Sequence, residues 1–78
     1  MMETPIHSLS DLFRQLGLDD DPMAMDGFVA VHRPLSDRVL LADAPFWDAS
    51  QARLLREELA KDGDWAGVVD HLNSLLRA

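Results

Sequence analysis

The sequence predicts an all-α protein: an irregular small bundle of about four helices, the last two forming an antiparallel hairpin. Three observations predict this fold. Apolar residues recur at helical spacing in several segments, capping residues and prolines bound those segments, and only one short stretch has a strand pattern. A single domain over residues 1–78 is expected, with a long ordered loop (34–47) lying across the hairpin. The expected helices span approximately residues 9–16, 22–32, 49–61 and 65–77.

The first helix is predicted by an apolar stripe at positions i, i+3, i+4 and i+7, formed by Leu9, Leu12, Phe13 and Leu16. Ser8 or Ser10 can cap its start, and Gly17 can end it in the left-handed conformation.

The second helix is predicted to start at Asp21 as N-cap, with Pro22 in the first helical position. Pro34 ends it, because a residue that precedes proline is disfavoured in helical conformation. Met23 and Met25 either fill the core or form an adaptable binding surface, and we expect them to fill the core.

The last two helices are joined by a turn so short that they must run antiparallel. Asp48 and Gln51 have the spacing of a capping box at the start of the third helix. Its inner stripe consists of Ala52, Leu55 and Leu59, with Leu54 beside it. The segment 62–64 ends this helix and caps the next. The stripe of the fourth helix consists of Trp65, Val68, Val69, Leu72, Leu75 and Leu76.

Residues 34–47 carry no helical stripe. Residues 37–42 could be extended, with Val39 and Leu41 on one side and Leu40 on the other. Because nothing else in the chain has a strand pattern, such a strand would have to pair with a second copy. An ordered loop that packs its own side chains is the favoured alternative.

Two of the five aromatic residues, Phe46 and Trp47, follow Pro45 at the end of this loop. Large apolar groups in irregular backbone either seal a core or contact a partner, because Trp and Phe are enriched at interfaces. The candidate interaction residues are therefore Phe46, Trp47, Leu41 and Val39.

The composition limits the classes of function. A net charge of −7, from fourteen acidic and seven basic side chains, disfavours binding to nucleic acid or to an anionic membrane. There is no cysteine for a disulfide or a thiolate metal site. The first residues lack a signal-peptide pattern, and no apolar run is long enough to span a membrane. A cytoplasmic protein is expected.

No motif predicts catalysis, a cofactor or a metal. His7, His32 and His71 lie in different segments, and no pair has the i, i+4 spacing of a zinc site. The run Asp19–Asp21 lacks the glycine and glutamate that a calcium loop needs further along, so a helix cap explains it better. An enzyme is therefore not indicated.

Three stretches resemble one set of short bacterial proteins, those grouped as domain of unknown function 2789. These stretches are Ser8–Leu18, Leu41–Trp47 and Asp64–Asn73, and the central one is the most specific. The resemblance covers nearly the whole chain in order. It implies a small bacterial protein with no assigned activity, cofactor or partner, so no site residues follow from it.

We therefore expect a protein-interaction or self-association module, with an unknown protein or a second copy as its partner. The alternative is a small ligand-binding protein or an enzyme whose site forms between subunits. A buried carboxylate at Asp43 or Asp70 would favour this alternative. A third alternative, an acidic mimic of nucleic acid, would need its carboxylates gathered on one face.

Overall fold

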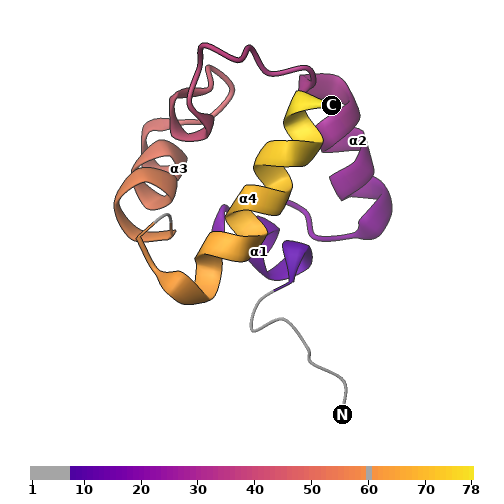
Figure 1. The fold of residues 1–78 in the computed structure, drawn as a ribbon. Coiled ribbons are helices and arrows are strands. Elements are labelled where there is room, and N and C mark those ends of the chain that lie inside the picture. Colours follow the sequence, from indigo (N-terminus) through magenta and orange to yellow (C-terminus); the bar gives the residue numbers. More distant parts are fainter. Residues whose placement is uncertain (1–7, 60) are drawn as a thin grey trace.

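The computed structural model describes residues 8–59 and 61–78, which form helices and connecting segments without any strand. α4 crosses the middle of the molecule, with α2 on one side and α3 on the other (Figure 1). α4 packs against α1, α2 and the π-helix η2, whereas α2 packs against α1 and α4. The all-α prediction is confirmed. The elements in chain order are α1 (Leu9–Gln15), α2 (Pro22–His32), the 3₁₀ turn η1 (Leu41–Asp43), α3 (Ala49–Arg53), η2 (Leu54–Leu59) and α4 (Gly63–Arg77).

The ends of the first two helices follow the expected capping chemistry. Of the two candidate serines, Ser8 is the N-cap of α1: its hydroxyl accepts from the backbone N–H of Asp11 at 3.2 Å, and the Asp11 carboxylate accepts from that of Ser8 at 3.0 Å. Gly17 follows α1 with φ of +73°, in the left-handed conformation that glycine adopts without strain. Asp21 caps α2 through the N–H of Met23 at 3.1 Å.

The hairpin differs from the prediction in its details. Asp48 and Gln51 form the expected capping box, with N···O distances of 2.7 and 3.0 Å. The predicted helix 49–61 is α-helical only to Arg53 and continues as the π-helix η2; its residue 60 lies outside the described residues. Leu55 and Leu59 are buried in the observed π-helix, and their i, i+4 spacing would also bury them together in an α-helix. Their spacing therefore does not predict which of the two helices forms.

α4 begins two residues before the expected start at 65. Asp62 is its N-cap and accepts from the backbone N–H of Asp64 at 2.9 Å. The apolar stripe begins only at Trp65, so the polar first turn was assigned to the connection. η2 and α4 pack as the two arms of the predicted antiparallel hairpin (Figure 1).

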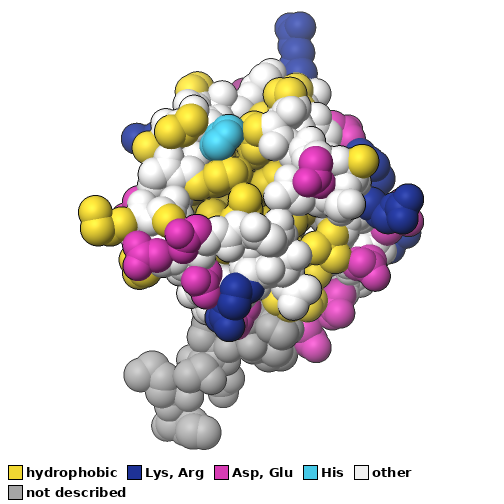
Figure 2. Space-filling model, turned by 180° about the vertical axis from the view of Figure 1, so that it is seen from behind, with side chains coloured by type: hydrophobic (Ala, Val, Ile, Leu, Met, Phe, Trp, Pro, Cys, Tyr) yellow, Lys and Arg dark blue, Asp and Glu magenta, His cyan; other side chains and the backbone are white. Residues whose placement is uncertain are grey.

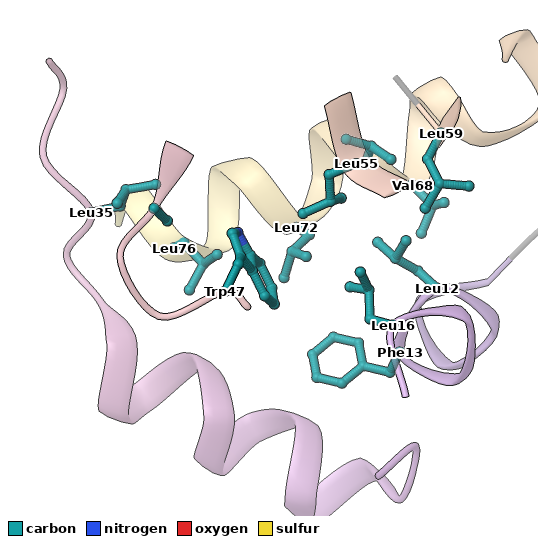
Figure 3. Close-up of a cluster of buried hydrophobic side chains, with 12 residues drawn as sticks. Leu12, Phe13, Leu16, Leu35, Trp47, Leu55, Leu59, Val68, Leu72 and Leu76 are labelled. Carbon is teal, nitrogen blue, oxygen red and sulfur yellow. The ribbon is translucent and has the colours of Figure 1, made fainter. Parts of the chain in front are cut away.

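The core lies along α4 and is completed by α1, η2 and the loop (Figure 3). Trp47 stands beside Leu72 and Leu76 of α4 in this view. None of the polar or charged side chains in the described residues is buried. The buried residues are Leu12, Phe13, Leu16, Leu35, Ala44, Trp47, Leu55, Leu59, Val68, Val69, Leu72 and Leu76.

The loop 34–47 is ordered by hydrogen bonds to the last turn of α4. The backbone N–H of Leu35 donates to the carbonyl of Leu76 at 2.7 Å. The guanidinium of Arg77 donates to the carbonyls of Ser36 at 2.6 Å and Val39 at 2.7 Å. The 3₁₀ turn η1 occupies the end of the stretch that could have been extended, so the loop alternative describes it.

No helix in the described ranges has the length and apolar character needed to cross a membrane.

Candidate interaction surface

The four candidate interaction residues do not form one patch. Trp47 is 8% exposed and belongs to the core, whereas Phe46, Leu41 and Val39 are half-buried. Phe46 packs with Trp47 in a cluster of aromatic rings. Leu41 lines a separate groove, and Val39 meets Arg77 through its backbone carbonyl.

The aromatic cluster comprises Phe13, Phe28, His32, Phe46 and Trp47. Phe28 is at its centre, and its ring stacks on that of Trp47 with the centroids 5.6 Å apart. Its centroid also lies 5.5 Å from that of Phe13 and 5.7 Å from that of Phe46, both in an edge-to-face arrangement. Each such pair contributes about 0.5–1.5 kcal/mol beyond the area that it buries. These contacts fix α2 and the end of the loop against α1.

His32 closes this cluster on the side of solvent. Its ring lies 4.2 Å from that of Phe28 and 4.4 Å from that of Phe46. Its Nδ1 lies 2.7 Å from the carbonyl oxygen of Phe28, and because a carbonyl only accepts, this nitrogen carries the proton. This role could not be predicted from the sequence, because no local pattern links His32 to Phe46.

The apolar side chains of the rear face gather around a hollow, next to a histidine (Figure 2). Acidic and basic side chains lie mainly around its edges. On the face seen there, acidic groups are interspersed with basic and apolar ones.

A second apolar depression, which we call the η1 groove, lies between η1, η2 and α4. Its volume is about 330 Å³, and its exposed lining is mostly apolar. Leu40 stands at its rim with 71% of its surface exposed, one of the largest values for a bulky apolar residue in the described part of the chain. The lining residues are Leu40, Leu41, Ala42, Asp43, Leu55, Arg56 and Val69.

The backbone of this groove is held in place by hydrogen bonds. The indole N–H of Trp47 donates to the carbonyl of Leu41 at 2.8 Å. The N–H of Asp43 donates to the carbonyl of Leu40 at 2.9 Å, which closes the 3₁₀ turn. Trp47 therefore positions the groove from inside the core, although it does not line it.

Asp43 and Arg56 form an ion pair at the edge of the groove, with an N···O distance of 2.5 Å. Both side chains are about half exposed, so the pair contributes at most about 1 kcal/mol to stability. A partner can exchange such a pair at little cost.

A third depression, of about 390 Å³, lies between the end of α1 and α3 and carries more polar groups. Two of them serve the fold: Asp48 and Gln51 form the capping box, and the Gln51 amide also donates to the carbonyl of Leu16 at 2.9 Å. Asp43 and Asp70, the carboxylates that an enzyme site would have used, are both exposed. Within residues 8–59 and 61–78 no three His, Asp or Glu side chains converge as metal ligands.

Sequence reasoning missed three residues of these surfaces. Leu40 was placed opposite the candidate side of an extended stretch, but the 3₁₀ turn brings it to the rim beside Leu41. Phe28 and Arg77 were recognised only as helix residues. Their roles depend on contacts with distant parts of the chain, for which a single sequence carries no signal.

The comparisons with known proteins give a family and no function. A family model described as "Protein of unknown function (DUF2789)" matches residues 2–76. Neither the curated proteins nor the solved structures yielded a match.

Proposed function

This chain belongs to the DUF2789 family, and we propose that it is a protein-interaction module with no catalysis of its own. The η1 groove is its docking site. The observation that carries this proposal is an open, mostly apolar groove with Leu40 exposed at its rim. Covering such a side chain with a partner contributes about 1.5–3 kcal/mol to the free energy of binding.

The groove is ordered before a partner arrives, and this supports the proposal. The bonds from Trp47 and Arg77 fix the backbone on both sides of Leu40. A partner then loses less free energy to ordering of the loop, so more of the contact energy remains as affinity. The π-helix η2 forms the opposite side, and π-helical turns occur often at functional sites.

The partner that fits is an amphipathic helix with an apolar anchor and basic flanking residues. An apolar side chain fills the space between Leu41 and Leu55, as in other helix-in-groove complexes. The chain's net charge of −7 favours a basic partner through the rate of encounter. Asp43 is the acidic residue in the lining of the groove, and its carboxylate can accept a hydrogen bond from a lysine or arginine of that partner.

The test is a selection of displayed helical peptides on the immobilised protein. Selected peptides are then titrated by fluorescence anisotropy against the wild type and two variants. Leu40→Asp places a charge at the groove, and Ser74→Asp adds the same charge at an exposed position of α4 that does not line the groove. We expect Leu40→Asp to weaken binding by at least about tenfold, a loss of roughly 1.4 kcal/mol, and Ser74→Asp to leave it unchanged.

Two outcomes would overturn the proposal. Equal affinity for both variants would show that the peptides bind elsewhere. If no peptide were selected, and the methyl signals of Leu40 and Leu41 instead shifted saturably with a library of small apolar molecules, the site would be a ligand pocket, for which 330 Å³ is near the lower size limit of about 300 Å³.

A further inference from the structure

α2 exposes apolar residues that the rest of the chain does not cover. None of its residues is buried, although a helix with apolar residues on all sides is normally enclosed. Met23 is 82% and Val31 77% exposed. With Gly27 between them they follow one line at i, i+4 and i+8, which we call the outer face of α2.

A groove of about 300 Å³ runs beside this face, between α2 and the ends of α1 and α4. It has opposite charges along its length: Asp26 belongs to the first half of α2, and Arg33 is the residue that follows its last turn. They lie seven positions apart, which corresponds to about 10 Å along a helix. Within the described residues neither side chain has an ion-pair partner. The lining residues are Leu9, Pro22, Met25, Asp26, Val29, Ala30, Arg33 and Leu75.

We infer that this surface binds a second copy of the chain, with the two α2 helices antiparallel across a two-fold axis. A two-fold interface must be complementary to itself, and the opposite charges of this groove meet that condition. The antiparallel arrangement brings Arg33 of each copy toward Asp26 of the other, on both sides of the axis. It also sets the positive end of each helix dipole beside the negative end of its partner.

Gly27 permits close contact at this surface. Apart from its chain neighbours and the backbone of its own helix, a side-chain methyl group at this position would have no atom of the described residues within 4 Å. In the pair, the missing side chain lets the second α2 approach the backbone. Val31 then faces the partner helix, and Met23 lies at the edge of the contact.

The net charges of the two copies oppose this association but do not prevent it. Each chain carries −7, yet physiological salt screens exposed charges beyond about 8 Å. At the surface itself the two Arg33–Asp26 contacts are attractive.

The test is analytical ultracentrifugation of the full chain over a dilution series, with charge-swapped variants. Arg33→Asp and Asp26→Arg each place like charges opposite one another, so each should raise the dimer dissociation constant by about tenfold or more. The double variant restores opposite charges in reversed order and should recover dimerisation. Arg38→Asp, which makes the same charge change at an exposed loop residue, is the matched control and should dimerise like the wild type.

A wild type that stays monomeric at every concentration would overturn the inference. So would a dimer that Arg33→Asp and Arg38→Asp affect equally, because the interface would then lie elsewhere. Circular dichroism spectra verify that each variant is folded. Leu40→Asp should leave dimerisation intact, so this inference and the proposed function fail or hold separately.

Discussion

α2 and α4 are both rich in apolar residues, but only α4 contributes buried side chains to the core. α4 contributes Val68, Val69, Leu72 and Leu76 to the core, whereas α2 contributes no buried residue. The apolar residues of α4 form one stripe, with charged residues on the other side. Those of α2 surround the helix, while its neighbours α1 and α4 cover only part of it.

The difference shows that apolar content alone does not decide which helix stabilises the fold. A helix in the middle of the bundle buries its stripe against several neighbours, and that burial stabilises the single chain. A helix at the edge keeps apolar surface in water, and this surface becomes useful only on association. Mutations in the buried stripe of α4 should therefore change the free energy of unfolding, whereas mutations on the outer face of α2 should change association.

The largest effect should come from Leu72→Ala in α4. Leu72 is 0% exposed, so the substitution leaves a cavity and should lower the free energy of unfolding by about 2–5 kcal/mol. Val31→Ala in α2 removes similar atoms from a position that is 77% exposed and should change it by less than about 0.5 kcal/mol. Urea unfolding of a dilute sample measures both. Similar losses in the two variants would mean that α2 is part of the cooperative core.

Arg77→Met should have the next largest effect. It keeps much of the side-chain length but removes the hydrogen bonds to the carbonyls of Ser36 and Val39. We expect a loss of about 1–3 kcal/mol, because these bonds have a charged donor. Arg77→Lys, which can keep one bond, should lose less.

Amide hydrogen exchange shows where the Arg77→Met loss arises. Faster exchange should be confined to the loop, beginning with the N–H of Leu35 that binds the end of α4. If α1 exchanged just as fast, the bonds of Arg77 would be supporting the whole fold and not the loop.

Two glycines give a matched pair of smaller effects. Gly27 in α2 and Gly67 in α4 are both exposed, and beyond its own helix a methyl group at either position would meet no atom of the described residues within 4 Å. Each substitution by alanine should raise the stability of the monomer by up to about 1 kcal/mol, measured by urea unfolding. Only Gly27→Ala should also weaken dimerisation, since only Gly27 lies on the outer face of α2. Equal dimerisation of the two variants would contradict close helix contact at that point.

The smallest effect on stability should come from Met23→Lys. Met23 is 82% exposed, so the free energy of unfolding should change by less than about 0.5 kcal/mol. The added charge should nevertheless weaken dimerisation, because it places an ammonium group at the edge of the apolar contact. Sedimentation and urea unfolding on the same samples separate the two. A clear loss of monomer stability would show that Met23 has contacts within the chain.

Local patterns predicted the parts of the fold that depend on local chemistry. The caps at Asp21 and Asp48 and the left-handed Gly17 could be predicted because each involves residues within one turn. The stripe of α4 could be predicted because its period matches its burial. Met23 was expected in the core and lies in solvent, since no pattern in a single sequence says which side of an apolar helix has neighbours.

The site was less predictable than the fold. Leu41 was found as a candidate residue, but its neighbours in the groove come from η2 and α4. The π-helical turn that shapes one side of the groove has no propensity signal, because it depends on how the surrounding residues pack. Trp47 was a candidate interaction residue that could also have sealed the core, and in the single chain it fills the core and holds the backbone of Leu41.

The anchoring of the loop by Arg77 has a consequence for the order of events during synthesis. Ser36 is made 41 residues, and Val39 38 residues, before the arginine that binds them. At a translation rate of about 5–20 residues per second, Arg77 is added roughly 2–8 s after these loop residues. α1, α2 and η2 are also translated before the helix on which they pack. We therefore expect the core to form only once α4 has emerged from the ribosome.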